Sequence, residues 1–369
     1  MSFSFSSLVR LLVVTALGST LAAIALSKLD PSGPEWRTAV ATRYTNLNEY
    51  FMKSADRTPR WLDAQTGQVV GFPLEDGDVV EAATCSPWVD EKGQHQMAGR
   101  WSSRTQMGPA SISTDFGIAR YQIPSGKLLD HVSTEIVPVG PPCWFPGLRA
   151  RILFAGGDGE LYHYAFEPDA QLKQTDPEAG RDLAPTPVTW RCPKPGLGEV
   201  FMSDLTWPEH PSLSGYLCVS LRVQAGQAGP PRVYTKTRLW WLKLDLAGTE
   251  ILEAGRLLLP DAAHPDEIPS DRRTPAVGML PDGRLAVAYL EDRGIHRGWD
   301  LRVAPIEFQG DHHVPTAREA SSILLATGCQ PASPSFSADG RWLNAIQATP
   351  NLGGRTLRVC LDRDFPKSN

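Results

Sequence analysis

The amino-acid sequence predicts an all-β fold, a β-propeller of six blades, each a four-stranded antiparallel sheet. A short phrase recurs along the chain, in which a proline and an aromatic or bulky apolar residue precede a polar turn ending in Gly, often as Asp-Gly. An apolar, strand-like run follows each copy. The copies recur about every 55 to 70 residues, which is typical of a strand-turn-strand unit repeated around an axis.

The composition is that of an ordinary globular protein. The chain has 369 residues, 41% hydrophobic content and a formal net charge of -5, which excludes a disordered chain. Repeated units bury their faces against their neighbours, so residues 31–369 are predicted to form a single propeller domain. The basic residues are scattered and form no stripe, which disfavours nucleic-acid binding.

Residues 1–30 are a different kind of sequence. Arg10 precedes an apolar run over 11–26, and Ala23-Ile24-Ala25 resembles a cleavage site for an export signal. The run of about 16 residues is shorter than the ~20 that comfortably span a bilayer. We expect a hydrophobic N-terminal helix that is either a cleaved signal peptide or a retained membrane anchor. In both cases we expect the body of the protein to be exported. It is either periplasmic, or anchored in the membrane and facing away from the cytoplasm.

The blades are expected in chain order, beginning with an incomplete unit over 49–70. Tight Gly turns and apolar runs then predict strands over 82–88, 96–102 and 118–127; 151–166; 202–221 and 238–246; 284–290 and 300–306; and 342–348 and 355–362. The last unit lacks an outer strand and the first lacks its early strands. A segment near 36–44 is therefore predicted to close the ring.

The clearest copies of the phrase carry a family resemblance. Residues 333–340 read Ser-Pro-Ser-Phe-Ser-Ala-Asp-Gly, residues 274–285 contain a second copy, and 240–246 form a later Trp-Trp-Leu-Lys-Leu-Asp-Leu strand. These segments are similar to the TolB-like, WD40-like propeller repeats of bacteria, and the whole chain resembles exported bacterial propellers. The resemblance implies the propeller fold and a scaffold role, and it carries over no site residue.

The cysteines leave two interpretations open. Six thiols in an oxidising compartment allow 15 disulfide pairings, and sequence alone does not choose among them. Buried free thiols are the alternative. The chain has no Cys-x-x-Cys pair, so no metal site is predicted from the cysteines, which are Cys85, Cys143, Cys192, Cys218, Cys329 and Cys360.

No catalytic constellation is evident, and the prediction names no catalytic residue and no cofactor. The Gly-x-Ser-x-Gly motif of serine hydrolases is absent from the sequence. A glycosidase built on a propeller needs two carboxylates from separate blades at one axial end. By repeat phase the most axial acids are Asp158, Asp204, Glu291 and Asp292. The alternative is that they are turn acids that bond to the backbone or to solvent.

Two polar segments are predicted to be loops rather than metal sites. An acidic stretch with a central His264 contains Asp261, Asp266, Glu267 and Asp271. It lacks the ordered pattern of acidic residues that defines a calcium loop, so a hydrated loop between blades is favoured. The pair His312-His313 is likewise expected in an exposed loop, and no metal is predicted.

Three tryptophans at one repeat phase are the candidate ligand-binding residues. Trp88, Trp144 and Trp207 could form a platform for sugar rings, with Arg100, Arg104 and Arg273 as hydrogen-bond donors. Packing between blades is the alternative for all three rings. A ligand platform requires the rings to be exposed, whereas packing between blades requires them to be buried.

The function predicted from these features is a non-catalytic scaffold that binds a protein partner in the bacterial cell envelope. The alternative is an exported hydrolase or lyase that acts on glycans, or a propeller that binds a sugar or another small ligand. Convergence of acids from different blades at one end of the axis would favour the alternative.

Overall fold

The computed structural model describes residues 44–46, 60–63, 66–71, 79–89, 94–107, 110–145, 151–166, 184–196, 199–208, 210–225, 233–260, 270–292, 298–309, 314–348 and 354–366. The predicted export segment, the N-terminal helix and all of the segment near 36–44 except Tyr44 lie outside these residues. Within them, no helix has the length and apolar character needed to cross a membrane.

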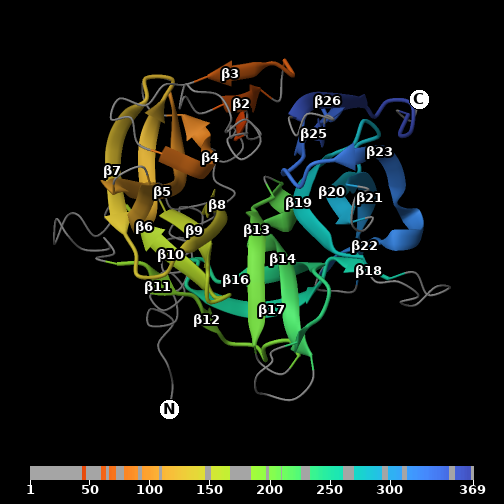
Figure 1. The fold of residues 1–369 in the computed structure, drawn as a ribbon. Coiled ribbons are helices and arrows are strands. Elements are labelled where there is room, and N and C mark those ends of the chain that lie inside the picture. The colour runs from red at the N-terminus through yellow and green to blue at the C-terminus, as the bar shows by residue number, and fades with distance from the viewer. Residues whose placement is uncertain are drawn as a thin grey trace, which may run out of the picture.

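The predicted all-β propeller is confirmed. Antiparallel sheets lie around a central axis in chain order, as Figure 1 shows. Each blade presents one strand to the axis, and these inner strands pack against one another in sequence. The inner strands are β4 (Val79–Val89), β8 (Pro138–Trp144), β13 (Val200–Thr206), β19 (Arg272–Met279) and β24 (Ser335–Phe336).

The first two of these inner strands begin four-stranded blades. The β4 blade continues with β5 (His95–Met107), β6 (Ala110–Ile123) and β7 (Lys127–Ser133). The β8 blade continues with β9 (Arg151–Gly156), β10 (Leu161–Ala165) and β11 (Thr186–Pro187). The predicted hairpin over 151–166 is therefore present, with its glycine-rich turn between β9 and β10.

The next two blades each gain a strand from the chain that precedes them. The β13 blade contains β14 (Tyr216–Ala225), β15 (Val233–Tyr234), β16 (Arg238–Leu244) and β17 (Glu250–Arg256), and β12 (Thr189–Trp190) pairs parallel with β17. The β19 blade contains β20 (Leu285–Asp292), β21 (Trp299–Gln309) and β22 (Val314–Arg318), and β18 (Leu258–Leu259) pairs parallel with β22. Short 3-10 turns are η1 (Pro211–Leu213) and η2 (Glu319–Ser321).

The chain ends in a blade made of β24, β25 (Trp342–Ala348) and β26 (Gly354–Cys360). A further strand, β23 (Ile323–Cys329), pairs with both β21 and β25 and so joins the last two blades. Strands β17 and β23 are among the strands that were not predicted. Most of their residues are exposed or partly buried, unlike those of a strand that is apolar and buried along its length.

An N-terminal set of short strands lies beside the last blade (Figure 1). It consists of β1 (Tyr44–Asn46), β2 (Arg60–Asp63) and β3 (Val69–Gly71), and β1 also pairs with β4. The Arg358 guanidinium of β26 donates a hydrogen bond of 2.7 Å to the Thr66 carbonyl in the β2–β3 turn. The two ends of the described chain therefore meet. Five inner strands and this hairpin are described, and the count of six blades stays a prediction.

The core is a series of apolar layers between consecutive blades. Leu153 of the β8 blade and Leu217 of the β13 blade are fully buried in one layer. Trp241 and Tyr289 are buried in the next layer, between the β13 and β19 blades. Burying each such side chain contributes roughly 1.5 to 3 kcal/mol. Blade packing, rather than a single central core, therefore stabilises the fold.

All six cysteines are free thiols in this structure. Cys218 is buried, and burial, together with the neighbouring Cys143, raises the pKa of its thiol to about 12. A thiol with so high a pKa is a poor nucleophile at neutral pH, because the thiolate is the reactive form.

Candidate functional site

Three consecutive inner strands depart from regular geometry at the same place. In β8, β13 and β19 the register with the neighbouring strand shifts, and within each shift one residue has positive φ: 71° at Gly140, 51° at Asp204 and 53° at Thr274. Glycine adopts this conformation readily, whereas for other residues, and for a β-branched residue above all, it is strained. Asp204 and Thr274 therefore hold strained backbone next to the axis.

The Asp204 side chain binds an arginine of the adjacent inner strand. Arg273 Nε lies 3.0 Å from Asp204 Oδ2, and Arg273 Nη2 lies 3.3 Å from Oδ1. The Ser203 hydroxyl donates a further hydrogen bond of 3.1 Å to Oδ2. The Asp204 side chain is 11% exposed and that of Arg273 is 36% exposed. This pair, which we call the axial pair, joins two blades and is accessible from solvent mainly through its arginine.

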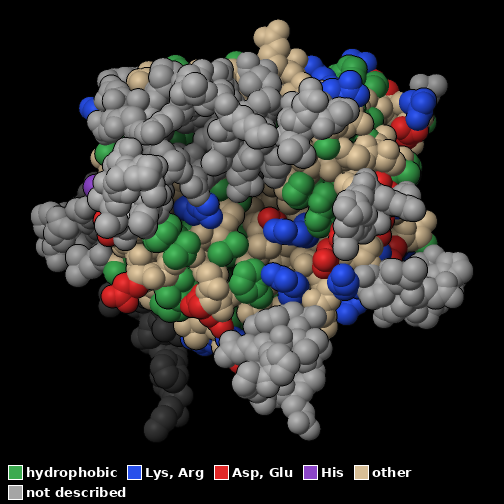
Figure 2. All heavy atoms as spheres, in the orientation of Figure 1, with side chains coloured by type: hydrophobic (Ala, Val, Ile, Leu, Met, Phe, Trp, Pro, Cys, Tyr) green, Lys and Arg blue, Asp and Glu red, His purple; other side chains and the backbone are tan. Residues whose placement is uncertain are grey.

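Figure 2 shows one face of the molecule, in the orientation that looks along the axis in Figure 1. Basic and acidic side chains lie beside one another in the middle of this face, where Figure 1 places β13 and β19. The charge there is mixed, and no broad patch of one sign covers the region.

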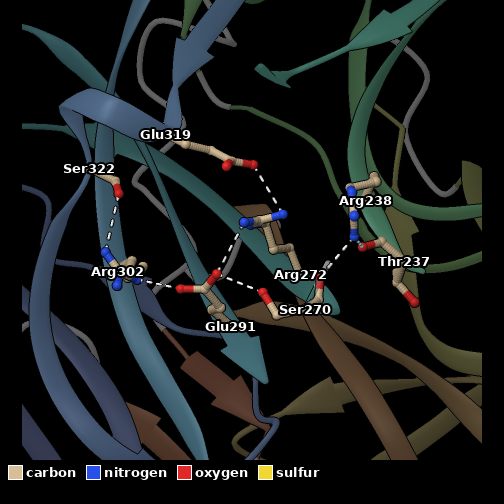
Figure 3. Close-up of polar contacts among 8 residues, drawn as sticks. All are labelled: Thr237, Arg238, Ser270, Arg272, Glu291, Arg302, Glu319 and Ser322. Carbon is tan, nitrogen blue, oxygen red and sulfur yellow. Dashed lines mark hydrogen bonds and ion pairs between the residues drawn. The ribbon is translucent and has the colours of Figure 1, made fainter. Parts of the chain in front are cut away.

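The neighbouring Arg272 takes part in a second polar network, drawn in Figure 3. Adjacent residues of a strand point to opposite faces, so Arg272 turns away from the axial pair. Its Nη2 donates a hydrogen bond of 3.1 Å to Glu291 Oε1, and its Nη1 lies 3.0 Å from Glu319 Oε1. Glu291 also accepts a 2.7 Å hydrogen bond from the Ser270 hydroxyl, and Arg302 Nε lies 2.6 Å from its other oxygen.

This network keeps Glu291 ionised. Burial alone would raise the pKa of Glu291, but the hydrogen bond from Ser270 and the charges of Arg272 and Arg302 outweigh it and hold the pKa below the ordinary value. A carboxylate of this kind is unsuited to donate a proton. We conclude that Glu291 ties β19, β20 and β21 together at the end of the blade where β19 begins, and that Arg272 links them to η2.

The other two acids named from the sequence lie at strand ends. Asp158 sits in the β9–β10 turn, where its Oδ2 accepts a 2.6 Å hydrogen bond from the Tyr162 hydroxyl and its Oδ1 accepts one of 3.2 Å from the Glu160 amide. It is a turn residue, as the alternative interpretation expects. Asp292 is the last residue of β20, and its amide bonds to the Asp271 carbonyl at 2.9 Å.

The three predicted platform tryptophans lie in two different apolar layers. Trp144 is 4% exposed and its ring meets Trp88 edge to face, with centroids 5.2 Å apart. Trp207 instead meets the ring of Phe145 at 5.2 Å, in the layer between the β8 and β13 blades. These contacts are those of packing between blades. A role in ligand binding for the three rings stays a prediction.

The predicted arginine donors are also separated. Arg100 Nη1 donates to the Pro138 carbonyl at 3.4 Å, whereas Arg273 belongs to the axial pair. The side chain of Arg104 lies outside the description. The structure thus brings together Asp204 and Arg273, which the sequence analysis singled out for separate reasons. It adds Ser203, which was not predicted, to the same site. The shared position of Gly140, Asp204 and Thr274 within the repeat is the signal that could have indicated this site.

Metal ligation is not evident in the described part of the chain, where no group of three or more His, Cys, Asp or Glu side chains is placed to hold a metal ion. Most of the acidic stretch, including His264, and the pair His312-His313 lie outside that part. Asp271 is described, and its Oδ1 accepts a 2.6 Å hydrogen bond from the Thr237 amide.

Comparisons with known proteins identify no family and find solved structures that are only distantly similar. The chain matches no known protein-family profile and no curated protein. Similar solved structures include a GH43 protein, BlXynB, from Bacillus licheniformis, with 12% identity, 83% of this chain and 62% of that chain covered, and a TM-score of 0.38. The match to NanB, solved with Optactamide, has 12% identity, covers 87% of this chain and 47% of NanB, and has a TM-score of 0.32. The match to a luciferin-regenerating enzyme has 15% identity, covers 74% of this chain and 89% of that enzyme, and has a TM-score of 0.28. The chain spans only 62% of the GH43 protein's length.

These findings correct the predicted function. The sequence favours a non-catalytic scaffold, whereas the GH43 protein and NanB are a glycoside hydrolase and a sialidase, in line with the alternative prediction. The scaffold prediction is therefore wrong. The prediction failed for a physical reason: a sequence supplies no distance between side chains of different blades. The contact between Asp204 and Arg273 at the axis could therefore not be foreseen.

Proposed function

We propose that this protein is a glycan-active hydrolase whose sugar-binding site is at the axial pair. The observation that supports the proposal most directly is Asp204 itself: a non-glycine residue at φ 51° on an inner strand, with its carboxylate gripped by an arginine of the next blade. Strained residues of this kind cluster at active sites and ligand clamps, because the surrounding fold must stabilise them.

The axial pair supplies one of the two groups that glycoside hydrolysis needs. One acid protonates the leaving oxygen, and a second group, a carboxylate, acts as base or nucleophile. Asp204 accepts two hydrogen bonds from a guanidinium and one from Ser203, so it is oriented as a carboxylate and suits the second role. Arg273 and Ser203 hold its oxygens in one direction, which is the positioning that catalysis requires.

The proposal includes an exported location and a place among TolB-like or WD40-like propellers. The location is supported by the apolar run over 11–26 with its Ala-Ile-Ala site, and the family by the Asp-Gly phrases near 282 and 339. Sugar polymers of the envelope or the surroundings are then the available substrates.

A comparison of two Asp→Asn variants tests the function. The full-length protein is assayed against a panel of aryl glycosides and polysaccharides. Asp204→Asn should lower kcat by about 10²- to 10⁴-fold, the usual contribution of a catalytic carboxylate, in a protein that remains folded but melts at a lower temperature, because the buried pair with Arg273 is weakened. The control is Asp282→Asn, which removes another arginine-bound aspartate, 2.6 Å from Arg284, in the turn between β19 and β20. Absence of turnover and of glycan binding in the wild-type protein, or an equal loss in both variants, refutes the proposal.

A further inference from the structure

We propose that the axial pair selects uncharged sugars over anionic ones, by accepting a hydrogen bond from a ligand hydroxyl at Asp204 Oδ1. The inference rests on the proposed function, and it adds the chemical class of the ligand. It follows from which hydrogen bonds the carboxylate already makes and from the charges that surround it.

The carboxylate has acceptor capacity left at one oxygen. Oδ2 accepts from Arg273 Nε and from Ser203 Oγ, which fills its two lone-pair positions. Oδ1 accepts only from Arg273 Nη2 among the described residues. One lone pair of Oδ1 therefore remains on a side chain that is still 11% exposed. A group that fills this position must donate a hydrogen bond, as a sugar hydroxyl does and an ionised carboxylate cannot.

The arginine of the pair is already shared with an anion. To bind a ligand carboxylate through Nε and Nη2, Arg273 would have to release Asp204 and leave that largely buried charge without its partner; a ligand carboxylate at the remaining Nη1–Nη2 edge would have to share the guanidinium with Asp204. Breaking such a pair lowers the affinity of the protein for the anionic ligand, because the charge left on Asp204 stays desolvated. The incoming anion would also face the Asp204 carboxylate at close range, where like charges repel.

The surrounding basic groups are already engaged. Arg272 and Arg302 bind Glu291, and Arg272 also binds Glu319. The guanidinium of Arg238 donates to the carbonyls of Thr237 and Ser270 (Figure 3). Arg222 lies over the Phe201 ring at 4.7 Å. The charges of Arg272 and Arg302 are balanced by carboxylates, whereas Arg238 and Arg222 have neutral partners. The chain as a whole is acidic, with a net charge of -5, so its overall field does not attract anions.

Sugars that differ only in charge give the direct test. Methyl galactopyranoside and methyl glucopyranoside are each compared with the matching methyl uronoside, in which the C6 hydroxymethyl group is a carboxylate. Binding to the full-length protein is measured by titration calorimetry or saturation-transfer NMR at pH 7 and low salt. At least one neutral sugar should bind about tenfold or more tightly than its uronoside, in keeping with one charge-assisted hydrogen bond.

The Asp204→Asn variant sharpens the test, because it removes the negative charge beside Arg273 while keeping the side-chain shape. Affinity for the neutral sugar should fall about tenfold, and the preference should narrow or reverse toward the uronoside. Asp282→Asn should leave both affinities unchanged. Equal or tighter binding of the uronosides by the wild-type protein overturns the inference and leaves the proposed function standing. Failure of all four sugars to bind, together with no hit in the glycan panel, overturns both.

Discussion

At the scale of single residues, two copies of the repeated phrase show how one local sequence meets two environments. Gly283 and Gly340 each follow an aspartate and have φ of 86° and 69°. In both turns the aspartate Oδ1 accepts a 3.0 Å hydrogen bond from the amide two residues later. A Cβ at Gly283 would meet nothing within 4 Å, whereas a Cβ at Gly340 would overlap the backbone oxygen of Met279 in the neighbouring blade.

Alanine substitutions at these glycines should therefore differ in cost. Gly283→Ala should destabilise the protein by about 1 kcal/mol, the cost of the left-handed backbone for a residue with Cβ. Gly340→Ala should cost about 3 kcal/mol or more, because backbone must also move at the interface between blades. Urea denaturation of the two variants measures both values. Equal costs would show that the overlap at Gly340 is relieved without disturbing the blade.

At the scale of elements, one carboxylate holds four segments together. Glu291 of β20 binds residues of β19 and β21, and Arg272 extends the network to Glu319 of η2. Its lowered pKa means that the folded state binds the ionised form better than the unfolded state does. The stability from this group is fully present above the unfolded pKa, about 4.3, and is lost as the pH falls through the lower folded pKa.

The Glu291→Gln variant should separate this contribution. At pH 7 it should be less stable than the wild-type protein by about 2 to 3 kcal/mol, since the two arginines lose a partly buried partner. Its stability should also fall less steeply between about pH 5 and pH 3. Glu253→Gln, which removes a half-exposed partner of Lys243, should change stability by less than about 1 kcal/mol. Parallel pH curves for Glu291→Gln and the wild-type protein would contradict the assignment.

At the scale of the whole molecule, the first and last described blades meet through Arg358. Its Nη1 donates to the Thr66 carbonyl, 292 positions away in the chain, and its guanidinium lies 4.6 Å from the centroid of the Trp342 ring. A propeller whose ends are joined leaves no free blade face exposed, and so resists opening between its first and last blades.

Truncation of this side chain should loosen that junction. Arg358→Ala should cost about 1 kcal/mol, from one hydrogen bond and one cation–π contact, and should speed amide hydrogen exchange in β2, β3 and β26 while leaving β13 and β14 unchanged. The control is Arg355→Ala on the same strand. Among the described residues its guanidinium bonds Gln347, which belongs to its own blade. The same exchange pattern in both variants would mean that the effect belongs to β26 and not to ring closure.

The sequence by itself determined the propeller fold and most of its strands. Apolar runs between Gly turns depend on neighbours within one hairpin, so they can be recognised locally; the hairpin of β9 and β10 is an example. The strands it missed include β17 and β23, in which most residues are exposed or partly buried, so the hydrophobic pattern there is weaker. Gly283 and Gly340 were equally recognisable as turn residues, and the sequence did not distinguish them.

Only the tertiary structure decided what these residues meet. Asp204 and Arg273 lie 69 positions apart, and each was named from its repeat phase, but their pairing depends on how two blades pack at the axis. The overlap that distinguishes Gly340 from Gly283, and the contact of Arg358 with Thr66, arise in the same way. Local patterns set the strands and turns because their energies come from near neighbours in the chain; contacts between blades come from packing, which no short stretch of sequence encodes.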